Sequence, residues 1–236
     1  MKHRLQSHPA HPPPAGLRVE VRRLRPDDRT RPLRLAFELF AGPDAVRVPA
    51  PLDRAAPRRA DGLWQHTCFE AFVAAPAAPA NPSMPAGSAA MDAAADSAAG
   101  VPYVEFNLAP SGAWAIYRFE DYRGAMRPES VGVEPQLVVS RQPGVLRVEV
   151  ALAWPVPLPG QRVADTAPAA TPSLLSTSAA APALPGASEA WRGRLGLSAV
   201  VEAADGSLSY WALHHPAARP DFHNGEGFAL GIEVPE

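Results

Sequence analysis

Hydrophobic and polar residues alternate along several stretches of the chain, and this alternation predicts β-strands. Residues 17–21 and 33–39 alternate aliphatic or aromatic side chains with mostly charged ones. The segment 145–154 is the clearest case, because its even-numbered positions are Leu, Val or Trp, whereas Arg147 and Glu149 occupy the other face. Such a pattern is typical of an antiparallel sheet with one buried face.

Turn residues separate further strand-like runs and predict hairpins. Pro110-Ser111-Gly112, Gln142-Pro143-Gly144 and Asp205-Gly206 combine a residue that presets a turn with a glycine that accepts positive φ. The runs that these turns join are 103–108 with 113–119, 136–140 with 145–154, and 193–202 with 207–214. No long amphipathic helix is found that could connect parallel strands. We therefore expect an all-β, antiparallel β-sandwich of about nine strands.

Composition changes along the chain and suggests where the domain lies. The stretches 74–100 and 155–190 are rich in Ala, Pro and Ser and carry too little large apolar surface to offset the entropy of ordering. We expect them to be low-complexity loops. Residues 1–16 combine His, Pro and Arg without an apolar stretch, so we expect a disordered tail and no secretory signal. The remaining 17–236 form one predicted β-sandwich domain.

Charge and cysteine content narrow the class of partner. The formal net charge is −2, which gives no electrostatic footprint for nucleic acid. Prolines interrupt the uncharged stretches, so no membrane span is expected. Cys68 is the single cysteine, so an intrachain disulfide is impossible. We expect a cytoplasmic protein, and its oligomeric state stays open.

Two strand-like runs carry polar and aromatic residues on one face each. Alternation predicts that Trp64, His66, Cys68 and Glu70 share a face, and that Tyr103, Glu105 and Asn107 share another. If the two faces are adjacent, aromatic rings and carboxyl groups meet as a small-ligand site requires. The alternative is ordinary packing of aromatic rings with solvated carboxylates. The candidate ligand-binding residues from this reasoning are Trp64, His66, Glu70, Tyr103, Glu105 and Asn107.

Other chemistries use the same residues with less support. Glu70 and Glu105 could be the acid and base of a glycoside hydrolase, but no rich Asp/Glu cluster surrounds them, so we expect no catalysis. Cys68 shares a face with His66 without defining an activated pair, and a buried, inert thiol is the favoured interpretation. A metal or haem ligand set could come from several spaced residues that match no compact motif. Its candidates are His214, His215, His223 and Asp221, together with His66 and Glu70.

Several segments together resemble the bacterial DOMON-like domain proteins, which are related to family-nine carbohydrate-binding modules. The segments are Leu63-Trp-Gln-His-Thr-Cys-Phe-Glu-Ala-Phe72, 103–117 with 119–123, 195–202, 209–216 and 220–223. The resemblance implies a sandwich of about nine to eleven strands with a ligand site on a concave sheet face. It also implies Glu70 and Glu105 as acidic strand positions, and Trp64, Trp114 and Trp211 as candidate stacking rings.

The same resemblance implies a choice of ligands. Related domains bind sugars or haem, and some sugar-binding relatives hold calcium. The axial Met and His ligands of the haem binders have no secure counterpart here, and Met126 falls in a loop. We therefore expect a non-catalytic protein that binds a small molecule, with carbohydrate as the favoured class. A haem- or metal-binding domain is the alternative, and a glycoside hydrolase is less favoured.

Overall fold

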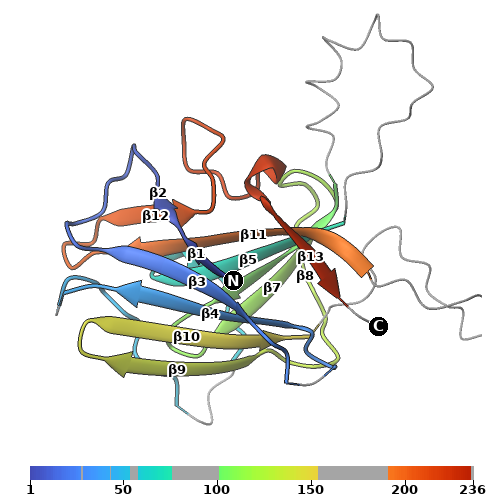
Figure 1. The fold of residues 1–236 in the computed structure, drawn as a ribbon, viewed down its shortest axis with the longest axis horizontal. Coiled ribbons are helices and arrows are strands. Elements are labelled where there is room, and N and C mark those ends of the chain that lie inside the picture. Colours follow the sequence, from blue (N-terminus) through green and yellow to red (C-terminus); the bar gives the residue numbers. More distant parts are fainter. Residues whose placement is uncertain (28, 43, 54–57, 76–100, 154–190, 235–236) are drawn as a thin grey trace, which may run out of the picture.

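The computed structural model describes residues 1–27, 29–42, 44–53, 58–75, 101–153 and 191–234. These residues form thirteen β-strands and two short 3-10 helices, η1 (Leu63–Gln65) and η2 (Gly225–Gly227). All strand pairs are antiparallel and fall into two sheets (Figure 1). The predicted all-β sandwich is confirmed, with more strands than expected because several very short strands extend both sheets.

The first sheet has five strands, which lie side by side in the order β1-β3-β4-β10-β9 (Figure 1). Their bounds are β1 (Lys2–Arg4), β3 (Arg18–Leu24), β4 (Leu33–Phe40), β10 (Val145–Leu152) and β9 (Gln136–Gln142). Gly144 in the β9–β10 turn has a φ of 76°, a conformation that glycine adopts without steric cost. The predicted hairpin is thus present.

The second sheet has eight strands in the order β2-β12-β11-β5-β6-β7-β8, with β13 paired to β11. Their bounds are β2 (Gln6–Ser7), β12 (Leu208–Ala212), β11 (Trp191–Glu202), β5 (Cys68–Ala74), β6 (Tyr103–Leu108), β7 (Trp114–Phe119), β8 (Arg127–Pro128) and β13 (Leu230–Val234). The hairpins predicted at Gly112 and at Gly206 both form.

The hydrophobic core lies between the two sheets and follows the predicted alternation. Inward-facing positions of β4 and β10, such as Leu35 and Val148, are fully buried. They meet inward positions of the second sheet, where Phe69 stacks on Phe37 with ring centroids 5.1 Å apart. Burial of each such side chain contributes roughly 1.5–3 kcal/mol to folding, so this interior stabilises the sandwich.

The N-terminal residues correct one prediction. Instead of a disordered tail over 1–16, β1 pairs with β3 in one sheet and β2 pairs with β12 in the other. Leu5 lies between these two strands and is only 1% exposed. The hydrophobic alternation in this segment is too short to predict strands. The segment is nevertheless ordered, because Leu5 is buried and the two short strands pair with the edges of the two sheets. The predicted loops at 74–100 and 155–190 lie almost entirely outside the described residues, and Ala74 ends β5.

Within the described part of the chain, no helix is long and apolar enough to cross a membrane.

Candidate functional site

Two buried carboxyl groups lie on the outer face of the eight-stranded sheet, on the side away from the core. Pairing of β5 with β6 sets Glu70 opposite Asn107 and Phe72 opposite Glu105. Glu70 and Glu105 are therefore diagonal neighbours on one face, a relation with Cα atoms roughly 7–8 Å apart. Their side chains are nearly inaccessible, with relative exposures of 2% and 5%. The register thus brings together the two strand faces that the sequence singled out.

Each carboxyl group has one hydrogen-bond donor beside it. Ser198 Oγ on β11 donates to Glu70 Oε2 at 2.9 Å, and Asn107 Nδ2 donates to Glu105 Oε1 at 2.8 Å. His223 Nε2 lies 4.0 Å from Glu105 Oε2, which is too far for a hydrogen bond. Both donors are neutral, so no basic side chain compensates the two carboxyl groups by direct contact among the described residues.

Burial raises the pKa of both groups. The pKa of Glu70 rises to about 8, first because burial disfavours its charged form and second because Glu105 lies close. Burial also raises the pKa of Glu105 to about 7, although Asn107 and Arg123 act in the opposite direction. At neutral pH the pair therefore holds at least one proton, so it can donate as well as accept a hydrogen bond.

A cavity of about 330 Å³ opens onto this pair. Such a volume lies at the small end of the range found for ligand sites, which runs from roughly 300 to 1,000 Å³. Its walls come from η1, β7, β12 and the loops after β7 and β12. Besides Glu70 and Glu105, the side chains that line the cavity include Trp64, Phe119, Arg123, Tyr210, Phe222 and His223.

A second hydrophobic cluster supports one side of the cavity. Tyr103 stacks on Phe119 with centroids 4.7 Å apart, and Phe72 stacks on Phe228 with centroids 5.6 Å apart. Gly196 on β11 makes the second contact possible, because a Cβ at this position would lie 2.5 Å from the Phe228 ring. The sheet is therefore packed on both faces here, and the loop before β13 is held against its outer face.

Hydrogen bonds fix the loop that carries His223. Tyr103 Oη lies 2.7 Å from His223 Nδ1, while Asp221 accepts hydrogen bonds from Tyr122 at 2.7 Å and from Arg123 at 3.0 Å. Burial, together with the charge of Arg123, lowers the pKa of His223 to about 4. His223 is thus neutral at pH 7, and the positive charge of Arg123 is directed at Asp221.

The structure distributes the predicted ligand-binding residues among different roles. Trp64 lines the cavity and is 37% exposed, but it lies in η1 because β5 begins only at Cys68. His66 is also outside the strand and contacts Glu202, the last residue of β11, at 2.8 Å. Tyr103 and Asn107 are buried and hold His223 and Glu105 in place.

Trp114 and Trp211 correct the expectation of stacking rings. Both are 3% exposed and pack in the core between the sheets. The physical reason is the strand register, because Trp114 lies opposite Leu108 and Trp211 lies opposite Ala199, both of which face inward. Alternation instead turns Tyr210 outward, and it is Tyr210 that reaches the cavity.

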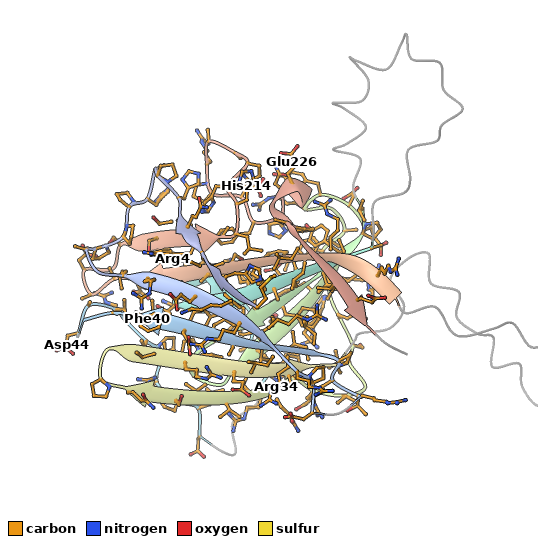
Figure 2. The ribbon with its side chains drawn as sticks, in the orientation of Figure 1. Arg4, Arg34, Phe40, Asp44, His214 and Glu226 are labelled. Carbon is orange, nitrogen blue, oxygen red and sulfur yellow. The ribbon has the colours of Figure 1, made fainter. Side chains whose placement is uncertain are left out.

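The candidate metal ligands do not converge. His215 Nε2 lies 2.9 Å from the carbonyl oxygen of Gln6, and His223 and Asp221 bind the partners given above. His214 is exposed, in the loop after β12 at the top of Figure 2. Among the described residues, no group of three or more His, Cys, Asp or Glu side chains is placed to hold a metal ion. The candidate residues therefore do not form one metal-binding cluster, although His223 lines the cavity together with Met126.

Several cavity residues carried no readable signal in the sequence. Arg123 and Phe222 lie in loops, where no periodicity reports which way a side chain points. Phe119 ends β7, and the sequence pattern predicts it as part of a hairpin without indicating that its side chain lines a cavity. Tyr210 could have been found, because it follows the period of β12 on the face opposite Trp211.

Comparison with known proteins gives a likeness of fold. No family model matches the chain, and no curated protein matches it. The structure is similar to a crystal structure from Bacteroides uniformis ATCC 8492 of a protein named "putative carbohydrate-binding protein", with a TM-score of 0.51 and 15% sequence identity. The match covers 99% of this chain and 85% of the other. At this identity the likeness shows the sandwich alone, and the resemblance to DOMON-like proteins stays a prediction.

Proposed function

We propose that the protein is a non-catalytic binder of a small carbohydrate, which occupies the cavity on the outer face of the eight-stranded sheet. One observation carries this proposal. The buried carboxyl groups of Glu70 and Glu105 line the cavity with only the neutral donors Ser198 and Asn107 hydrogen-bonded to them, and the exposed ring of Trp64 lines the same space. A carboxyl group can make more than one hydrogen bond, so a ligand that supplies further polar groups is favoured.

The residue types suit a sugar. The apolar face of a sugar ring packs on an aromatic side chain, and its hydroxyl groups exchange hydrogen bonds with carboxyl groups. Trp64, Tyr210 and Phe222 supply rings, and Glu70 and Glu105 supply the polar groups. The name of the structural neighbour agrees with this class, although fold does not fix the ligand.

The test uses fluorescence and calorimetry with a panel of soluble oligosaccharides. Trp64 lines the cavity and is 37% exposed, so a ligand that stacks on it changes the emission. We expect Trp64→Ala to weaken binding by roughly tenfold, because a stacked ring contributes about 0.5–1.5 kcal/mol beyond its buried area. Val138→Ala, on the exposed strand β9, is the control and leaves affinity unchanged.

Three results would count against the proposal. Binding by no sugar in the panel, or binding that Trp64→Ala does not affect, removes the cavity as a carbohydrate site. Release of reducing sugar from a bound oligosaccharide, lost in Glu70→Gln, would replace the binder with a glycoside hydrolase that uses the same two carboxyl groups.

A further inference from the structure

We infer that the sugar bound in this cavity carries a protonated amine, as amino sugars do, and that the amine lies between Glu70 and Glu105. This inference rests on the proposed function and names its ligand more closely. Its basis is the imbalance between acidic and basic groups around the cavity, together with the aromatic rings that line it.

The cavity has two carboxyl groups without a cationic partner. No Lys, Arg or charged His among the described residues forms an ion pair with Glu70, and Glu105 has only the distant contact with His223. Arg123 is the cationic residue that lines the cavity; its charge lowers the pKa of Glu105, but its guanidinium donates to Asp221 at 3.0 Å and not to either carboxyl group of the pair. A buried carboxylate without a cation is costly, so the pair keeps protons until a cation arrives.

The walls favour an ammonium group over a neutral one. Trp64, Phe119, Tyr210 and Phe222 surround the carboxyl groups with aromatic rings. The faces of such rings attract cations, and the attraction is strongest where water is excluded. A protonated amine therefore meets negative oxygens and ring faces together, whereas a plain hydroxyl gains only hydrogen bonds.

The protons held by Glu70 and Glu105 make binding of an ammonium group depend on pH. When the ammonium group binds, it lowers the pKa of both carboxyl groups, and a proton leaves the site. Binding of the amine should therefore tighten as pH rises from 5 towards 7, by up to about tenfold per pH unit for each proton released, until the amine itself begins to lose its proton. A neutral sugar that accepts hydrogen bonds from the protonated pair should not bind more tightly as pH rises over this range.

Other titratable groups near the pair do not imitate this behaviour. Burial raises the pKa of Cys68, Tyr103 and Tyr117 far above the range from 5 to 7, and the pKa of His223 lies below it. Hydrogen bonds from Tyr122 and Arg123 outweigh burial and lower the pKa of Asp221. Further charged or titratable neighbours include Arg123, which lines the cavity with Tyr210, and Asp61, which accepts a hydrogen bond from the Tyr117 hydroxyl. Behind the cavity-lining rings lie His11, 5.0 Å from the Tyr210 ring, and His215, 6.3 Å from the Phe222 ring, whose pKa burial lowers.

The experiment compares three oligosaccharides of one length and linkage: a β-1,4-linked glucosamine oligomer, its N-acetylated form and the glucose oligomer. Isothermal calorimetry at pH 5.5, where the amino-sugar amine is fully protonated before it binds, in two buffers of different ionisation enthalpy gives affinity and proton release. We expect the amine form to bind roughly tenfold to thirtyfold more tightly than the other two, and to release protons. Glu70→Gln and Glu105→Gln should each reduce this preference by about tenfold.

Glu149→Gln makes the same chemical change on the other sheet and should keep the preference. If the N-acetylated or glucose oligomer binds as well as the amine, or if binding of the amine takes up protons, the inference fails while the proposed function stands. If none of the three binds and the wider panel gives no ligand, both fail.

Discussion

The outer faces of the two sheets hold buried carboxyl groups in different surroundings. On the five-stranded sheet, Glu38 contacts Arg22 at 2.9 Å and Arg147 at 2.7 Å, and Glu149 contacts Arg34 and Arg147 (Arg34 is labelled in Figure 2). On the eight-stranded sheet, Glu70 and Glu105 contact only neutral donors. Both arrangements come from alternating strands, so the difference lies in the residues on neighbouring strands.

The two environments have opposite effects on ionisation. Burial alone would raise the pKa of Glu149, but hydrogen bonds from Arg147 and Arg34 outweigh it and lower this pKa overall. Nothing comparable opposes burial at Glu70. The five-stranded sheet thus has a compensated ionic face, whereas at Glu70 on the eight-stranded sheet only the neutral donor Ser198 opposes burial.

The aromatic cluster is the second difference, and it gives the largest expected effect on stability. Phe72 is 1% exposed and contacts Phe228, His223 and Tyr103 on the outer face of the eight-stranded sheet. We expect Phe72→Ala to lower the free energy of unfolding by roughly 3–5 kcal/mol, as core truncations of phenylalanine do. Urea denaturation measures this loss. Val138→Ala truncates an exposed side chain on the outer face of the other sheet and should lower the free energy of unfolding by under about 0.5 kcal/mol. If the two variants lose equal free energy of unfolding, the two outer faces do not differ in packing.

The carboxyl groups give a smaller effect that depends on pH. The pKa of Glu70 is near its ordinary value in the unfolded chain and about 8 in the folded one. The folded state therefore holds a proton that the unfolded state loses, so stability falls as pH rises from about 4.5 to 8. Glu70→Gln removes this decline. We expect the variant to be more stable than the parent by roughly 1–3 kcal/mol at pH 9 and equal to it at pH 4, by urea denaturation.

Glu149→Gln is the matched control and should act with the opposite sign. Because the folded-state pKa of Glu149 is lowered, its stabilisation is present above the unfolded pKa and is lost as pH falls through the folded one. The variant should be less stable than the parent by about 0.5–1 kcal/mol at pH 7, with the gap closing in acid. A Glu70→Gln variant that is destabilised at pH 9 would show that this carboxyl group is ionised and compensated.

The sequence predicted the sandwich and the two strand faces that carry Glu70 and Glu105, but not the other residues that line the cavity. Alternation places Glu70 and Glu105 on one face as soon as β5 and β6 are neighbours, and strands consecutive in the chain commonly pair even when a long stretch separates them, as it does here. The same alternation would have turned Trp114 and Trp211 inward, had the register with Leu108 and Ala199 been known. Register depends on pairing across distant parts of the chain, which a local pattern does not report.

The loop residues that line the cavity could not be predicted from the sequence for a different reason. Arg123 has a φ of 55°, and its side chain meets Asp221, which lies 98 residues further along the chain. Only the packing of both loops on the sheet brings these groups together. The short strands β1 and β2 were missed in the same way, because their partners hold them and their own residues show no pattern.

The most direct test of the central claim is an NMR titration of the glutamate side-chain carboxyl carbons, with and without the glucosamine oligomer. The account predicts that Glu70 and Glu105 titrate near pH 8 and pH 7 in the free protein, and at lower pH once the oligomer is bound. Glu149 should titrate below its ordinary value in both samples. If Glu70 and Glu105 instead titrate below about pH 5, as ordinary carboxyl groups do, and do not respond to the oligomer, the outer face of the eight-stranded sheet is not the site proposed for it.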